Sequence, residues 1–171
     1  MATYQSPLTV IIKGAIAGAA GTAAMGAAME RAPKVLESMG VQVPTPPPGP
    51  TAPDSPPEAL AERVAEGVAE QPMGPQAKAT AGQVMHWGYG AAWGAYYAVI
   101  QSSLKPPPLL HGALFGALVG TVASAVVPRL GLQNPPSRNP PKLNAMYMGY
   151  HLVYGVTTAV VYAILNLGRR G

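Results

Sequence analysis

The sequence predicts an all-α integral membrane protein with four transmembrane helices, chiefly because of how its charge is distributed. Charged residues make up only 11% of the 171 residues, and all seven acidic residues lie between positions 30 and 70. Four runs therefore contain no charged residue: 14–29, 79–104, 106–128 and 143–168. A helix needs about 20 apolar residues to cross roughly 30 Å of hydrocarbon. The last three runs reach that length, and the first does so when Lys13 extends to the interface.

These runs place the transmembrane helices at about residues 8–29, 81–104, 109–127 and 143–167 of a single domain covering 1–171. A soluble connector occupies residues 30–80. Because the link between the second and third helices is short and proline-rich, we expect these two helices to form an antiparallel hairpin.

Small residues recur at helical spacing and predict where the helices pack. In lipid, helices associate by close van der Waals contact, and glycine permits two backbones to approach. The candidate helix-packing residues are Gly14, Gly18, Gly21, Gly90, Gly112, Gly116, Gly120 and Gly155.

The connector divides into a proline-rich segment and an amphipathic helix. Eight prolines fall between residues 44 and 57, a composition typical of polyproline-like spacers. Ser55 and Glu58 have capping-box spacing, so we expect a helix from Pro56 to about Glu70. An acidic stripe follows that helix: Glu58, Glu62, Glu66 and Glu70. These acids either face water or form a docking surface for a basic partner.

Basic residues lie singly near the helix ends. Seven fall in the connectors at 30–80 and 128–142, against four on the opposite side. The positive-inside rule then predicts cytoplasmic connectors and outward termini. This scattered pattern is not that of a nucleic-acid-binding patch.

Each of the three histidines lies in an expected membrane helix. His86 and His151 share the pattern H-x-x-Y-G, and His111 begins a looser version. The helices carrying His86 and His151 enter from the same side, so these two rings share a leaflet. One interpretation is axial ligation of haem or a chlorophyll-type pigment. The other is interhelical hydrogen bonding.

A polar face on the last helix is compatible with a small-solute channel or transporter. It consists of Tyr147, His151, Tyr154, Thr158 and Tyr162. However, the expected membrane helices contain no acidic residue, whereas ion-coupled transport usually requires one. The sequence has no cysteine, P-loop, G-x-S-x-G element or metal-ligand spacing. We therefore expect neither enzymatic activity nor a metal site.

Several motifs together resemble the YagU-like family of bacterial inner-membrane proteins, whose domain has no known function. They are Gly14-x-x-x-Gly18-x-x-Gly21-Thr22-x-x-Met25, the Pro56-Pro57 step into an acidic helix, and the H-x-x-Y-G elements. The resemblance implies a four-helix protein of the bacterial inner membrane and supplies no catalytic residues. The proline run over 44–57 has no counterpart in that pattern.

Our leading functional hypothesis is a non-enzymatic accessory or assembly subunit that is embedded in lipid. Its glycine faces exceed what one small bundle needs, so we expect contacts with other membrane subunits or a second copy. Pigment binding and solute transport are the alternatives.

Overall fold

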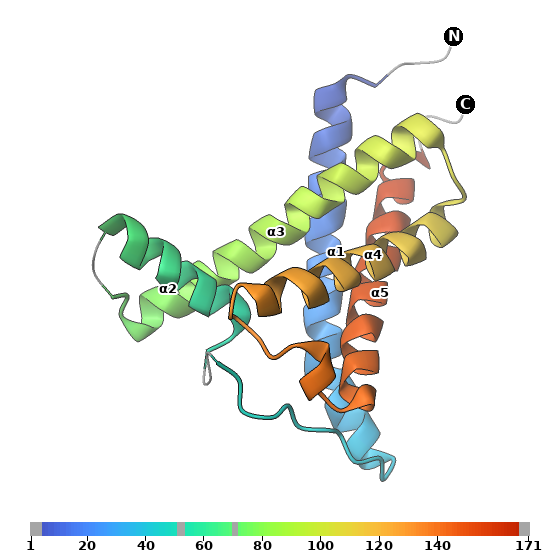
Figure 1. Ribbon diagram of the computed structural model, residues 1–171. Helices are drawn as coiled ribbons and strands as arrows, with labels where there is room; N and C mark the ends of the chain where they lie inside the picture. The colour runs from blue at the N-terminus through green and yellow to red at the C-terminus, as the bar shows by residue number, and fades with distance from the viewer. Residues whose placement is uncertain (1–4, 51–53, 70–71, 168–171) are drawn as a thin grey trace.

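The computed structural model describes residues 5–50, 54–69 and 72–167, and within these ranges it is all-helical (Figure 1). The helices are α1 (Pro7–Ser38), α2 (Pro56–Ala69), α3 (Pro75–Leu104), α4 (Pro108–Arg129), the short 3₁₀ helix η1 (Pro136–Arg138) and α5 (Pro141–Ile164). Each begins at a proline, which is suited to the first helical position because its φ is preset and its missing N–H would be unpaired there. The prediction of an all-α protein is confirmed.

Two helices extend well beyond the predicted membrane spans. α1 continues from residue 29 to Ser38, through Pro33, and α3 begins at Pro75 rather than near residue 81. Polar residues can continue a helix into water, as the Glu30–Lys34 pair does at 3.5 Å in α1. α1 ends where Gly40 adopts a positive φ of 75°.

By length and composition, two of the described helices could cross a membrane: α1 and α4. The predicted spans 81–104 and 143–167 fall in α3 and α5, which do not meet the same hydropathy criterion. Tyrosine, histidine, glycine and amide side chains lower the mean hydropathy of these two helices.

α1 packs against α3 and α5, α5 also packs against α4, and α2 lies against α3 (Figure 1). α1 and α5 run side by side, and α3 and α4 cross them at an angle. A short link joins α3 and α4, as the predicted hairpin requires, and Tyr97 of α3 contacts His111 and Phe115 of α4, but each of these helices packs more extensively on another helix. Glycine pairing provides the reason, because the closest backbone approaches lie between α1 and α3 and between α4 and α5.

The two outer crossings are built alike. In the first, a Cβ added at Gly18 would lie 2.7 Å from the Cα of Gly94. In the second, a Cβ added at Gly155 would lie 2.6 Å from the Cα of Gly116. Side chains larger than hydrogen would separate these backbones.

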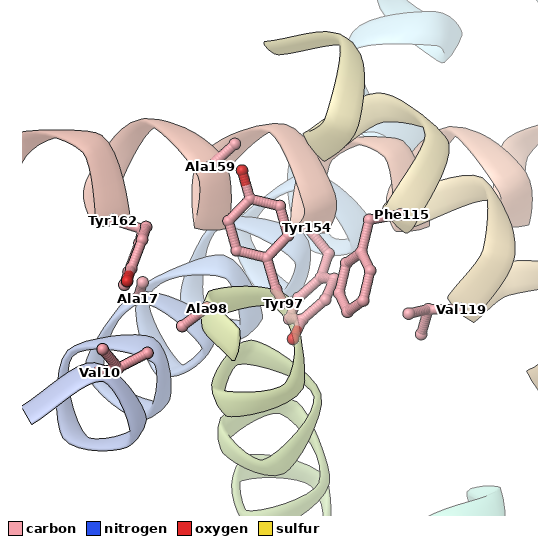
Figure 2. Close-up of a cluster of buried hydrophobic side chains, with 9 residues drawn as sticks. All are labelled: Val10, Ala17, Tyr97, Ala98, Phe115, Val119, Tyr154, Ala159 and Tyr162. Carbon is pink, nitrogen blue, oxygen red and sulfur yellow. The ribbon is translucent and has the colours of Figure 1, made fainter. Parts of the chain in front are cut away.

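Tyrosine and alanine dominate the buried core, which draws side chains from α1, α3, α4 and α5 (Figure 2). The Tyr97 ring is fully buried and contacts Phe115 at a centroid distance of 5.2 Å and Tyr162 at 6.0 Å. Aromatic rings in such edge-on contacts fill the spaces that the glycines leave open.

Large aliphatic side chains, by contrast, lie on the outside. Exposed examples are Leu8, Ile11, Ile12 and Ile16 of α1, Val84 and Val99 of α3, Leu114 and Leu118 of α4, and Val153, Val160 and Ile164 of α5. Extended exposed apolar surface is typical of faces that contact lipid or another protein.

Candidate functional site

A hollow lies between α4, the α4–α5 connector and the start of α5, and it has a volume of about 230 Å³. Met148 adds a thioether to the polar lining residues, which are Thr121, Ser124, Gln133, Asn134, Asn139, Asn144 and Tyr147. None of the described residues lining it is charged, so the hollow suits a neutral or softly bonding ligand rather than a strongly charged one.

Asparagines shape the mouth of this hollow. Asn134 donates from Nδ2 to the carbonyl oxygens of Pro47 and Pro48, both at 3.0 Å, and so attaches the proline-rich segment to the connector. Asn144 donates to the Pro136 carbonyl at 2.8 Å and accepts from Asn139 at 3.2 Å. These bonds hold an irregular connector in one conformation.

A second hollow, of about 470 Å³, lies between residues 48–50 and the same connector, with Arg138 at its edge. Nearby, Arg63 of α2 donates to the carbonyls of Leu130 and Gly131. Arg63 thereby places a positive charge at the C-terminus of α4, which favours cations. Sequence reasoning missed both Asn134 and Arg63 as structural contacts.

His86 lies on α3, His151 on α5 and His111 at the start of α4. His151 bonds through Nδ1 to the backbone oxygen of Tyr147 at 2.8 Å. The His86 side chain is half-buried. His111 stacks on Tyr97 at 4.4 Å and contacts Gln101 at 2.6 Å, near the α3–α4 link.

The glycines beside these histidines do not leave room for a macrocycle. The space at Gly90 is filled by Thr22 of α1, and the space at Gly155 is filled by the backbone of α4. The H-x-x-Y-G elements therefore accommodate neighbouring helices in this arrangement. Every other predicted packing glycine also meets another helix of the same chain: Gly14, Gly18, Gly21, Gly112, Gly116 and Gly120.

Most of the polar face of α5 is part of the packed core. Tyr154 is buried and donates its hydroxyl to the backbone oxygen of Gly90 at 2.7 Å. Thr158 is fully buried and donates to the Tyr154 carbonyl at 2.8 Å. Tyr162 is also buried, and Tyr147 alone of these tyrosines lines the hollow. This packing offers no support for a solute path between α3 and α5.

The acidic stripe of α2 is partly used within the chain. Glu62 and Asp54 both pair with Lys78 of α3, at 2.7 and 2.8 Å, and these bonds raise the pKa of Lys78 above its ordinary value. Glu58 accepts hydrogen bonds from the side chain and backbone of Ser55, which lower the pKa of this carboxyl.

The remaining members of the stripe are less constrained. Glu66 is exposed, and Glu70 lies outside the described residues. The apolar side of α2 does not pack on the bundle as its amphipathic pattern would suggest, because Val64 and Val68 are exposed. The Lys78 pairs turn the acidic side toward α3 instead.

No protein-family model matches the chain, and no curated protein or solved structure matches it significantly. The resemblance to the YagU-like family stays a prediction.

Proposed function

We propose that this chain is a non-enzymatic protein of the bacterial inner membrane, which α1, α3, α4 and α5 all cross. One observation carries the proposal: aliphatic side chains surround an interior of glycine, alanine and tyrosine. In lipid this distribution is favourable, because small residues permit tight helix contacts and aliphatic side chains face the hydrocarbon. The connectors carry more basic residues and therefore lie in the cytoplasm.

Internal hydrogen bonds support membrane insertion of the two less apolar helices. In hydrocarbon each polar group needs a partner from the protein. The Tyr154 hydroxyl has one on α3, and Thr158 of α5 donates to the Tyr154 carbonyl at 2.8 Å. At the far end, the Tyr97 hydroxyl donates to Gln101 at 3.1 Å. The free-energy cost of placing the polar side chains of α3 and α5 in hydrocarbon is therefore lower than the hydropathy of these helices alone implies.

Single-cysteine labelling tests the four crossings, since the sequence contains no cysteine of its own. Five exposed positions are suitable for labelling. One precedes the first membrane helix, one lies at each of the three links and one follows the last helix: Ser6, Ser38, Ser103, Ser137 and Leu167. In bacterial spheroplasts, an impermeant maleimide should label cysteine at Ser6, Ser103 and Leu167. Cysteine at Ser38 and Ser137 should react only after permeabilisation.

Comparing the labelling of two positions on either side of a helix tests whether that helix crosses the membrane. Equal labelling at Ser38 and Ser103 would show that α3 does not cross, and equal labelling at Ser137 and Leu167 would show the same for α5. A fully reversed pattern would retain the four crossings and overturn the orientation.

We further infer that the protein is an accessory subunit that contacts another membrane protein through the outer face of α3. Tyr89, Trp93 and Tyr96 form a ladder of edge-on rings, with successive centroids 5.9 Å apart. Tyr89 is 50% exposed and Tyr96 is 54% exposed. In the part of the chain described here, neither hydroxyl has a hydrogen-bond partner. Tyrosine is usual at membrane interfaces, but these residues lie near the middle of α3.

An uncovered hydroxyl in hydrocarbon costs on the order of several kcal/mol, so a polar group of a partner helix is the expected cover. The glycines do not supply this lateral surface, because they are occupied within the chain.

Photocrosslinking tests the accessory role. A benzophenone amino acid at Tyr96 should form a discrete adduct with another protein in native membranes. The matched control is Ile16 of α1, which is 52% exposed and lies near the same crossing. There we expect lipid adducts alone. Lipid adducts at both positions would refute the partner surface, and an adduct of two identical chains would replace the accessory role with self-association.

A further inference from the structure

Three polar side chains that line the 230 Å³ hollow have no hydrogen-bond partner in the described part of the chain: Ser124 of α4, Gln133 of the connector and Tyr147 of α5. Gln133 and Tyr147 are also partly withdrawn from water. Polar groups in such positions are usually paired, either within the protein or with a bound molecule. Two hydroxyl groups and one amide group are therefore available around a single space.

Asn139 adds a hydrogen-bond acceptor to this set. Its Nδ2 donates to Oδ1 of Asn144 at 3.2 Å, so its own Oδ1 is left without a donor among the described residues. Asn139 as a whole is only 8% exposed. Its Oδ1 is nevertheless not sealed, because within the described ranges the one sealed and unpaired side-chain polar atom is Oε1 of Gln5. Since Asn139 lines the hollow, a ligand can reach this oxygen from there.

The chemistry of the lining selects an uncharged ligand with several hydroxyl groups. Hydroxyl and amide side chains both donate and accept hydrogen bonds, and a ligand hydroxyl answers both at one atom. Among the described lining residues, an anion would find no cation and a metal ion would find no carboxylate. Pro128, Pro136 and Met148 also line the hollow and can cover the carbon skeleton of the ligand.

The size of the hollow favours one compact ring. Sites for drug-sized molecules usually have volumes of about 300–1,000 Å³, and this hollow is smaller. A single sugar ring combines a small volume, several hydroxyl groups and an apolar C–H surface. We propose that the hollow binds one uncharged sugar ring, either of a free sugar or of a glycolipid headgroup.

The position of the hollow makes both sources accessible. Thr121, Ser124 and Pro128 lie in the last turns of α4, where its charge-free run ends. If α4 crosses the membrane as proposed, this level is that of the lipid headgroups. Only the glycolipid source rests on the proposed crossing, since a free sugar needs the hollow alone. The site is also separate from the proposed partner surface on α3.

Saturation-transfer NMR tests the site in the full-length protein. The detergent should be a polyoxyethylene ether, because an alkyl maltoside would itself present sugar rings. The probes are the methyl glycosides of glucose, galactose and mannose. We expect a saturable signal from at least one of them. Tyr147→Phe and Ser124→Ala each remove one hydroxyl and should weaken its binding about threefold to tenfold.

Ser102→Ala is the matched control, since it makes the same change as Ser124→Ala on α3, away from the hollow. It should bind the glycoside like the parent. The absence of a saturable signal for all three glycosides would overturn the proposal. So would unchanged affinity in both variants of the hollow. If one variant fails to elute as the parent does in size exclusion, the other decides the outcome.

A competition experiment identifies the source of the ring. Monoglucosyl diacylglycerol is titrated into the complex of the parent with the glucoside, and phosphatidylethanolamine is the control lipid. Displacement by the glycolipid well below the concentration of free glucoside assigns the site to a lipid headgroup. Displacement only at a similar or higher concentration assigns it to a free sugar. Equal displacement by phosphatidylethanolamine would contradict recognition of a sugar. The cysteine labelling tests the crossing of α4 separately, and its failure would leave the binding of a free sugar intact.

Discussion

Replacing Gly18 by isoleucine should separate α1 from α3 and produce the largest loss of stability of any single change considered. The new Cβ would lie 2.7 Å from the Cα of Gly94 and against the carbonyl oxygen of Gly90. Both obstacles are backbone atoms, so no side-chain rotation relieves the clash. Overpacking of a core usually costs about 1–3 kcal/mol, and we expect the upper end or beyond because two helix axes must move apart. Thermal unfolding in detergent, followed by fluorescence-detected size exclusion, measures the effect.

Gly26→Ile is the matched control, since it makes the same change in the same helix. No atom lies within 4 Å of a Cβ added at Gly26. Glycine in a helix interior is itself unfavourable by about 0.5–1 kcal/mol relative to alanine, so this variant should retain or slightly gain stability. Equal destabilisation of both variants would contradict the glycine crossing and indicate a general effect of bulk in α1.

The helices were accessible to sequence reasoning because their signals are local. Charge-free length located the segments that became α1, α3, α4 and α5. Each of them begins at a proline, a signal that the prediction used only for α2, so the start of α3 was placed about six residues too late. The end of α1 was less accessible. Residues 30–38 are polar, and a hydropathy criterion stops at the interface although the helix continues in water. Local signals also did not predict which helices pack most closely, because α3 packs mainly on α1 and α4 packs mainly on α5.

The candidate site also combines features that local sequence signals predict with contacts that they do not predict. Counting residues along two helices predicts an equal depth for His86 and His151, and this stays a prediction. The contacts that shape the connector end did not, because Asn134 binds carbonyls more than 80 residues away and Arg63 binds carbonyls 67 and 68 residues away. Any exposed asparagine or arginine has the same sequence signature. The orientation of α2 failed to follow from its amphipathic pattern, because the Lys78 pairs outweigh burial of Val64 and Val68.

Reversing the charge of Lys13 should give the second large effect. Its ammonium group donates to the Leu165 carbonyl at 2.6 Å and to Oδ1 of Asn166 at 3.0 Å, just beyond the last residue of α5. A cation at a partly buried helix C-terminus contributes up to about 2 kcal/mol, and Lys13→Glu replaces this attraction with repulsion. We therefore expect a loss of at least about 2 kcal/mol in unfolding free energy, measured by denaturant titration in detergent.

Lys105→Glu separates this local effect from net charge. Lys105 is exposed at the same end of the bundle, and the described part of the chain offers it no ion-pair or side-chain hydrogen-bond partner. Both variants change the net charge by the same amount, and both remove a basic residue from the same side of the membrane in the proposed orientation. Lys105→Glu should change stability by no more than about 0.5 kcal/mol, as surface substitutions usually do. If the two variants lose equal stability, the loss arises from overall charge, and Lys13 does not hold the end of α5 against α1.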